Sequence, residues 1–415
     1  MKIKFLFLII PALIYADNLK SILDFATTSN KIVNSNALIE KAKSKEVESS
    51  KSDYYPTVDV GGFYQRLDDA SSFAPGTTYS GYAKVGVDLY DGGRKSNTIK
   101  QNKAILDSSK YNSLAYKKSL QLQIVQDFYN IKSAKSALDA LKESNIQISA
   151  ELDRVKKFYE AGTVTEDDVE RLRAAYSNNI YRISSVKYQI KSLKKILGIK
   201  VGKKIETLDD SSIKIPKNIQ KELTDDILAL QANSLSLTYS ANNISSAYYP
   251  QIKAEDTYSL YGYQDKPSMG GQEIKQLDNQ NKLMLTLNIR LFDMGVISKQ
   301  KESLLLQKEA LQKQIEQYQD EQDVNVELAM LKIDTTKAQI KSAKSALESS
   351  IIAYETVSKK YSAGVVDYVT YLDSLSVKTN AKAQYEKALN DLQIAYASYY
   401  YYTNKNIKDF IKWKK

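Results

Sequence analysis

The sequence of 415 residues contains no cysteine and no histidine. Without cysteine the chain can form no disulfide, no thiolate metal site, no catalytic thiol and no acylated lipoprotein anchor. Without histidine it can form neither a Ser-His-Asp triad nor a His-ligated zinc site. The remaining carboxylates occur in no recognisable catalytic or metal-binding motif. We therefore expect no enzyme activity, no cofactor and no metal.

Long apolar runs are absent beyond the N-terminus. There, an apolar stretch over residues 5–15 follows Lys2 and Lys4 and precedes a plausible cleavage site before Asp17. This pattern predicts a secretory signal peptide over residues 1–16, with a retained interfacial anchor as the alternative. No later stretch is long enough for a membrane helix, so the exported chain can enter a membrane only as a barrel.

Neither sign of charge dominates, with 59 basic against 49 acidic residues and a net charge of +10. The lysines are scattered at helical spacing, which favours solvated helix surfaces over a nucleic-acid-binding patch. We therefore expect no nucleic-acid partner. The chain has 31 tyrosines, and some occupy positions that suit an aromatic belt at a membrane interface. Many others recur at helical spacing, as packing residues do.

Three motifs occur twice in the same order. They are Tyr54-Tyr55-Pro56 with Tyr248-Tyr249-Pro250, Leu89-Tyr90-Asp91-Gly92-Gly93 with Leu291-Phe292-Asp293-Met294-Gly295, and Tyr159-Glu160-Ala161-Gly162 with Tyr361-Ser362-Ala363-Gly364. The interval from position 91 to 162 is 71 residues, and so is that from 293 to 364. This spacing predicts an internal duplication of a unit too extended to close a core by itself.

Period-two alternation of apolar and polar residues marks four predicted strands: 57–66, 79–90, 251–261 and 282–292. Each is close to the roughly 9–11 residues that a tilted strand needs to cross a bilayer. A half-buried sheet of a soluble protein alternates in the same way, but nothing apolar between these strands offers a second sheet. Four strands cannot close a barrel, so we expect other subunits to complete it. The polar loops 67–78 and 262–281 suit its external face.

Heptad spacing of apolar residues predicts coiled-coil packing in two long helical hairpins. Residues 94–160 contain no proline or glycine, and these 67 residues would span on the order of 100 Å as a helix. Gly162 ends this helix, and Thr165 with Asp168 resembles the cap of the returning one. The second copy follows the same course: a helix over 298–361, a turn at Gly364 and a return towards Tyr402.

With these motifs in this order, essentially the whole mature chain resembles the outer-membrane factor family of TolC-like export channels. The resemblance implies a mixed α/β membrane protein, a homotrimer in which four strands per chain build a twelve-stranded outer-membrane β-barrel. A long periplasmic α-helical barrel of coiled-coil hairpins would continue it. The implied partners are outer-membrane lipid, a periplasmic adaptor (membrane fusion) protein and an inner-membrane transporter, which supplies the energy.

The resemblance also implies a division of the chain into segments. In order they are the signal peptide 1–16, an N-terminal periplasmic helix 17–53, a first transmembrane β-hairpin 54–93, a first helical hairpin 94–197 with its tip at 159–168, an equatorial linker 198–222, a helix 223–248, a second transmembrane β-hairpin 249–293, a second helical hairpin 294–402 with its tip at 361–373, and a C-terminal tail 403–415.

Family members dock their adaptor and hold their closed gate at the helical turns. By position, the adaptor-docking tips are Gly162, Thr163, Val164, Gly364, Val365 and Val366. The gate residues are Tyr361, which matches the gating tyrosine, Asp168 and Asp373, which match acidic gate positions, and Thr370 and Asp367. Thr370 and Val366 replace an aspartate and an arginine of the usual salt-bridged lock, and Asp367 is the candidate compensation. Helix N-terminal charge is the alternative reading of Asp168 and Asp373.

The resemblance points to a passive exit duct for drug efflux or type I protein secretion. The alternative is a surface-anchored structural or adhesive coiled-coil protein. In autotransporter adhesins the membrane strands come last, after the stalk. Here strands alternate with helices in both copies, which favours the duct.

Overall fold

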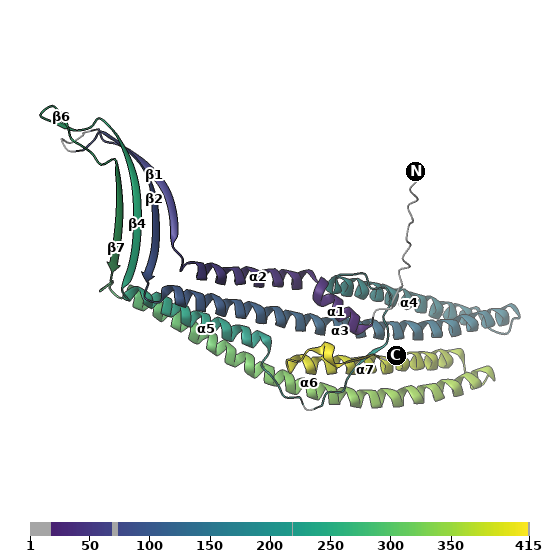
Figure 1. The fold of residues 1–415 in the computed structure, drawn as a ribbon. Helices are drawn as coiled ribbons and strands as arrows, with labels where there is room; N and C mark the ends of the chain where they lie inside the picture. The colour runs from purple at the N-terminus through teal and green to yellow at the C-terminus, as the bar shows by residue number, and fades with distance from the viewer. Residues whose placement is uncertain (1–17, 69–73, 218, 414–415) are drawn as a thin grey trace, which may run out of the picture. The chain divides into compact units, whose positions relative to one another are not determined.

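The computed structural model describes residues 18–68, 74–217 and 219–413, so the predicted signal peptide lies outside the described residues. The chain divides into two compact units. The helical unit consists of the described residues up to Asn36, Ser113–Asp225, and the chain from Gln319 onward. The sheet unit consists of Ala37–Asn112 and Asp226–Tyr318. Two helices of 67 residues, α3 (Arg94–Glu160) and α6 (Val296–Ser362), contribute to both units (Figure 1).

The sheet unit contains a four-stranded antiparallel sheet in the order β1-β2-β4-β7 (Figure 1). Its strands are β1 (Thr57–Arg66), β2 (Thr77–Tyr90), β4 (Gln251–Gln264) and β7 (Asn279–Asn288). Within the described chain, β1 and β7 are edge strands with one neighbour each. The unit also holds most of α2 (Lys31–Ser52) and of α5 (Asp225–Ser245), the short helix η1 (Ser246–Tyr248), and a small ribbon of β5 (Ser268–Met269) and β6 (Gln272–Glu273).

The strand register gathers apolar residues of all four strands on one face. Residues directly opposite each other in an antiparallel sheet project to the same side. Across the sheet, Val60 lies opposite Ala83, and Ala83 lies opposite Tyr258. The apolar and aromatic residues of this face are Val58, Val60, Tyr64, Tyr79, Ala83, Val85, Val87, Ile252, Ala254, Tyr258, Leu260, Leu283, Leu285 and Leu287, and Asp256, Asn279 and Asn281 interrupt them. Its edges are open to solvent, with Val60 83% and Leu283 78% exposed.

The opposite face of the sheet is polar and carries a chain of ion pairs. Lys253 Nζ lies 2.9 Å from Glu255 Oε1, and Lys84 Nζ lies 3.6 Å from the same oxygen. Lys84 Nζ also lies 4.0 Å from Asp59 Oδ2, so the pairs join β1, β2 and β4. The period-two alternation of the sequence thus becomes a sheet with one apolar and one charged face.

Four strand boundaries differ from the sequence prediction. β2 begins at Thr77 rather than at 79, and β7 begins at Asn279 rather than at 282. β7 ends at Asn288 rather than near Phe292, because Asn288 pairs with Gln251 and the residue before Gln251 is Pro250, which has no N–H to continue the ladder. In the opposite direction, β4 continues to Gln264 because its last residues pair with β2, down to Thr77. The predicted loop after β4 also contains the β5–β6 ribbon.

Aspartates at the two sheet-to-helix corners begin the long helices. Asp91 accepts hydrogen bonds from the backbone N–H groups of Gly93 (3.0 Å) and Lys95 (2.7 Å). Asp293 accepts from Gly295 and Ile297, both at 3.0 Å. Each carboxylate therefore satisfies N–H groups that the first turn of α3 or α6 leaves without a helical partner.

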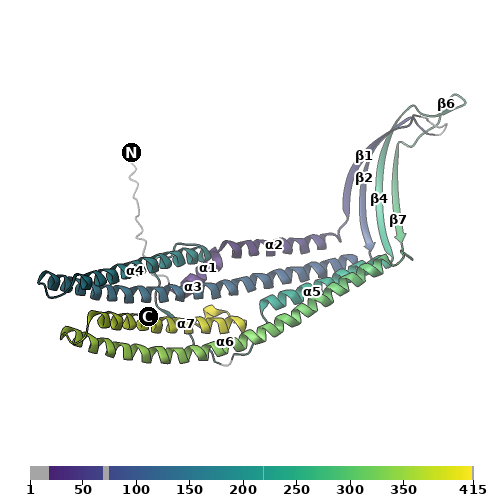
Figure 2. The same ribbon diagram turned by 180° about the vertical axis from the view of Figure 1, so that it is seen from behind.

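The helical unit packs α1 (Leu19–Ser29), α4 (Glu166–Val201) and α7 (Tyr368–Tyr402) with the distal parts of α3 and α6 (Figure 2). α4 is buried at Val169, Leu172, Asn179, Ile183, Ile190 and Leu197, which recur at the heptad spacing of a coiled coil. The main core includes Phe128, Tyr129, Leu197, Tyr400 and Ile407. Among the described residues, no helix has the length and apolar character needed to cross a membrane.

The predicted continuous helix over 17–53 is wrong, because it breaks at Asn30. This side chain is 6% exposed and bonds in two directions. Its Oδ1 accepts from the N–H groups of Ile32 (2.9 Å) and Val33 (3.1 Å), which starts α2. Its Nδ2 donates to the carbonyl oxygen of Lys200 at 2.7 Å, which ties the break to the end of α4.

The predicted linker and tail meet in the helical unit. α4 continues past Gly198 to Val201 and ends at Gly202, whose φ of +89° favours glycine. Beyond it, β3 (Ser211–Ile213) pairs antiparallel with β8 (Ile411–Trp413), which follows the short helix η2 (Ile407–Phe410). The C-terminal segment is therefore a strand partner of the segment between the two hairpins.

Candidate functional site

The two helical hairpins end in turns with the same hydrogen bonds. Gly162 has φ +72° and Gly364 φ +73°, a conformation that side chains rarely adopt. The N–H of Gly162 donates to the Tyr159 carbonyl (2.9 Å) and that of Gly364 to the Tyr361 carbonyl (3.0 Å). The following N–H groups, of Thr163 and Val365, donate five residues back at 2.9 Å in both turns. Both are Schellman motifs.

Side-chain caps then start the two returning helices. The N–H of Thr165 donates to Asp168 Oδ2 at 3.1 Å, and its hydroxyl donates to the same oxygen at 2.9 Å. Before α7, Asp367 Oδ1 accepts from the N–H and the hydroxyl of Thr370, at 2.8 and 2.7 Å. The hydrogen bond from the Thr370 hydroxyl lowers the pKa of Asp367, and the bond from the Thr370 N–H lowers it further. Three predicted gate residues, Asp168, Asp367 and Thr370, thus lie in helix caps.

The predicted gate tyrosine joins the two hairpins. The Tyr361 hydroxyl on α6 donates a hydrogen bond to the Glu151 carboxylate on α3. Arg154 donates to the same carboxylate oxygen from Nε (3.0 Å) and Nη2 (2.8 Å), and its guanidinium lies 4.6 Å from the centre of the Tyr361 ring. Burial, reinforced by the bond to Glu151, raises the pKa of Tyr361 to about 12. The phenol therefore stays protonated and remains a donor at neutral pH.

Two further tyrosines extend this contact. Tyr371 of α7 stacks on Tyr361 with ring centres 4.9 Å apart and planes at 22°. Its hydroxyl oxygen lies 3.3 Å from that of Tyr354 on α6, and the Tyr354 hydroxyl donates to Gln147 Oε1 on α3 at 3.0 Å. Burial raises the pKa of Tyr371. Three helices are therefore fastened by one cluster: Gln147, Glu151, Arg154, Tyr354, Tyr361 and Tyr371.

An ion-pair contact lies further along the same helices. Glu143 of α3 accepts from Lys382 Nζ of α7 at 2.6 Å and lies 3.8 Å from Lys378 Nζ. The hydrogen bond from Lys382 lowers the pKa of Glu143. Lys378 also lies over the Tyr354 ring, 4.4 Å from its centre. The contact between the hairpins thus combines aromatic, hydrogen-bonded and ionic parts.

Asp373 differs from the other predicted gate aspartates. It is exposed and forms no hydrogen bond or ion pair with any other residue in the described part of the chain. It borders a hollow of about 460 Å³ between α4 and α7, together with Arg171, Arg182 and Tyr368.

The predicted docking residues differ in exposure. Thr163, Gly162, Gly364 and Val365 are exposed, whereas Val164 and Val366 are half-buried. Val164 packs against a hydrophobic cluster formed by Leu152, Val155, Val169 and Leu172. Tyr368 and Leu372 of the second hairpin pack against the same cluster. A Cβ added at Gly162 or Gly364 would have no atom within 4 Å, so lack of space does not require glycine at either turn. The positive φ angle is the reason for glycine there.

The sequence prediction missed most of the cluster. It did not identify Gln147, Glu151, Arg154, Tyr354 or Tyr371, and the described residues contain no hydrogen bond between Tyr361 and any of the three predicted aspartates. Two features of the sequence could have indicated it. Glu151 and Arg154 are three residues apart, as an ion pair on one helix requires, and Tyr354 and Tyr361 are seven residues apart, on one face of a coiled-coil helix. Among the described residues, no group of three or more carboxylates is placed to hold a metal ion.

Comparisons with known proteins match nearly the whole chain. The family model of the outer membrane efflux protein matches residues 25–197 and 221–404. Outer membrane protein TolC of Escherichia coli (strain K12) is 21% identical over 405 residues, covering 91% of this chain and 81% of that protein. The Campylobacter jejuni CmeC outer membrane channel superimposes with a TM-score of 0.80 at 15% identity, covering 94% of this chain and 86% of the other. A membrane protein from Pseudomonas aeruginosa gives 0.79 at 15% identity, covering 94% and 91%.

Proposed function

Because this chain belongs to the outer membrane efflux protein family, we propose that it is the exit duct of a tripartite efflux or type I secretion system. Membership makes it an outer-membrane efflux channel protein that extends into the periplasm. In the proposed system, an inner-membrane transporter and a periplasmic adaptor deliver small molecules or polypeptides to the duct. In this proposal the duct conducts them passively, and the inner-membrane transporter supplies the energy.

The two-faced sheet is the observation that carries this proposal. Its apolar face suits lipid, and its face with the ion pairs of Lys84 and Glu255 suits a water-filled lumen. Backbone groups at an open sheet edge cannot be left unpaired in lipid. The free edges of β1 and β7 would therefore pair between copies, and three chains would close a twelve-stranded barrel.

The two tips are the proposed adaptor-docking sites. Both present the same Schellman backbone, so a homotrimer offers six similar turns to its adaptor. The exposed side chains differ, with Thr163 in one turn and Val365 in the other. The backbone would give the adaptor a common shape, and the side chains would decide which turn it prefers.

The tyrosine cluster is the proposed closed gate. It fastens α6 and α7 to α3 at one level, so the hairpins can separate only when the Tyr361–Glu151 bond breaks. An adaptor that binds the separated tips more tightly would shift the equilibrium towards the open duct. In a trimer the free carboxylate of Asp373 would recur three times around the axis, and such a ring concentrates cations and repels anions.

The proposal is tested with the purified chain in detergent and in planar bilayers. We expect a trimer by native mass spectrometry and discrete single-channel conductance steps. A monomer that gives no conductance would overturn the duct.

A further inference from the structure

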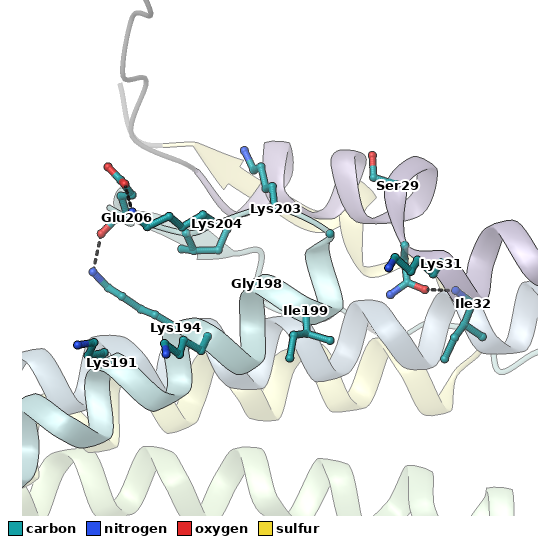
Figure 3. A pocket seen from close by; sticks show the side chains of 14 residues that line it. Ser29, Lys31, Ile32, Lys191, Lys194, Gly198, Ile199, Lys203, Lys204 and Glu206 are labelled. Atoms are coloured by element: carbon teal, nitrogen blue, oxygen red, sulfur yellow. Dashed lines mark hydrogen bonds and ion pairs between the residues drawn. The ribbon is translucent and has the colours of Figure 1, made fainter.

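A basic groove opens on the helical unit where α1 gives way to α2 and where α4 ends (Figure 3). Its volume is about 1090 Å³. Six of its fourteen lining residues are lysines and only Glu206 is acidic. The lysines are Lys31, Lys191, Lys194, Lys195, Lys203 and Lys204.

Within the described chain, the charge of two lysines of this groove, Lys191 and Lys195, is uncompensated. Lys194 donates to the Glu206 carbonyl and Lys204 pairs with the Glu206 carboxylate at 2.8 Å. Lys191 and Lys195, one turn apart on α4, form no ion pair with any residue that the structure describes. From Arg171 to Ile205 the sequence has ten basic residues and no acidic one. Ile199, beside these lysines on the groove wall, is 81% exposed.

An acidic stripe with exposed apolar residues runs along α6. From position 314 to 331 the sequence has five acidic residues and no basic one. Residues spaced by three or four lie on one face of a helix. On α6 such a face carries Asp320, Val324, Glu327, Leu331 and Asp334. All five are exposed, and Asp320 and Glu327 make no ion pair with the described chain.

The groove and the stripe lie on either side of the same core. Leu197 and Val201 of α4 belong to one hydrophobic cluster with Ala329 and Ile333 of α6. Ile199 and Leu331 lie midway between these buried pairs and therefore on the reverse faces of their helices. In both ribbon views α4 and α6 are the outer helices of this unit, with α3 and α7 between them (Figures 1 and 2).

We propose that the groove binds the acidic stripe of α6 from a second copy of this chain. The basic groove and the acidic stripe lie at the same level on opposite edges of the helical unit. Each copy can therefore place its stripe against one neighbour and its groove against the other. Such head-to-tail contacts between unlike surfaces close into a ring when the rotation from one copy to the next divides a full turn, as it does in a trimer. Exposed Ile199 and Leu331 form the apolar centre, and the lysines and carboxylates around them fix the partner and the register. This inference rests on the homotrimer of the proposed function and assigns the contact that joins its helical walls.

The chain has no cysteine, so paired cysteines report this contact without background. In a chain carrying Ile199→Cys and Leu331→Cys, a short bismaleimide should link neighbours into covalent dimers and trimers on a denaturing gel. Either single variant should stay monomeric. The matched control is Tyr181→Cys with Leu331→Cys, because Tyr181 is 75% exposed but lies 18 residues earlier on α4, about 27 Å away. It should not cross-link.

Charge reversal separates the partner from other anionic ligands. Lys191→Glu with Lys195→Glu should lower the cross-link yield about 3- to 10-fold. Asp320→Lys with Glu327→Lys should do the same, and the two reversals combined should restore it. An effect of the lysine changes alone, without rescue, would assign the groove to another anion and overturn the proposal. A conducting trimer without the Ile199–Leu331 cross-link would also overturn it but leave the duct intact. Cross-linked rings without conductance would instead contradict the duct.

Discussion

The hydroxyl of Tyr361 donates a hydrogen bond to the carboxylate of Glu151, which lies 210 positions earlier in the chain. The bond joins α6 to α3 and therefore one helical hairpin to the other. Arg154 holds the same carboxylate and covers the Tyr361 ring, so the tyrosine is fixed from two sides. A change at Tyr361 consequently acts on the contact between the hairpins rather than on the turn that follows it.

Tyr361→Phe should loosen the closed tip. The substitution removes the hydroxyl but keeps the ring that stacks on Tyr371. Losing one hydrogen bond to a charged group, about 1.5–3 kcal/mol, shifts an equilibrium roughly 10- to 150-fold. We expect the ratio of open to closed channels in planar bilayers to rise by that factor. Tyr368→Phe is the control, because the Tyr368 hydroxyl makes no hydrogen bond within the described chain. Equal conductance of the two variants would contradict the gate.

The Glu143 contact should make the joined hairpins sensitive to acid. Its bond from Lys382 lowers the pKa of Glu143 below the ordinary 4.5. A carboxyl with a lowered folded-state pKa contributes stability above its ordinary pKa and loses it as the pH falls through the lowered value. Glu143→Gln should therefore reduce the Tm at pH 7, and the gap to the native chain should close below about pH 4.5.

A variant at a neighbouring aspartate of α3 provides the comparison for this pH series. Asp139→Asn removes an ion pair to Lys142 that is confined to α3. It should leave the Tm at pH 7 nearly unchanged, since exposed pairs within one helix contribute about 0.3–0.5 kcal/mol. A Glu143→Gln gap that persists at pH 3 would show that the loss is not due to the ionised carboxylate.

The parts of this molecule that depend on local geometry could be predicted from the sequence. Gly162 and Gly364 mark turns because their backbone conformation excludes most side chains, and Thr165 with Asp168 marks a cap because the bonds span three residues. The end of β7 was predicted too late, because Pro250 limits this strand only once its pairing with β4 is known. The partner of Tyr361 could not be predicted either, because a bond across 210 residues depends on how the helices pack.

The break at Asn30 could not be predicted from the sequence either, because it depends on a tertiary contact. A polar residue within a helical pattern is ordinary, and nothing nearby in the sequence distinguishes it. Its Nδ2 reaches the Lys200 carbonyl, 170 positions away, and that tertiary bond makes the break favourable. The pairing of β3 with β8 is equally remote, so the sequence indicated only a linker and a tail.

Asp367 should act through its cap rather than its charge. Asp367→Ala removes both bonds from Thr370 and should destabilise the start of α7 by about 0.5–2 kcal/mol. Hydrogen exchange should then become faster at the amides of residues 368–371. Asp367→Ser keeps a capping oxygen without the charge and should retain native exchange. If the serine variant exchanges as fast as the alanine variant, the carboxylate charge matters more than the cap.

A charge on the apolar face of the sheet should prevent insertion. Val60→Arg places a guanidinium among Val58, Ala83 and Tyr258, and an arginine facing lipid near the middle of the bilayer costs about 2–4 kcal/mol. Gln65→Arg adds the same group to the opposite face of the same strand, where water would solvate it. We expect the Val60 variant to be depleted from outer-membrane fractions and the Gln65 variant to be recovered there as a trimer. Equal recovery of both would mean that the apolar face does not contact lipid, and the barrel orientation would have to be reversed.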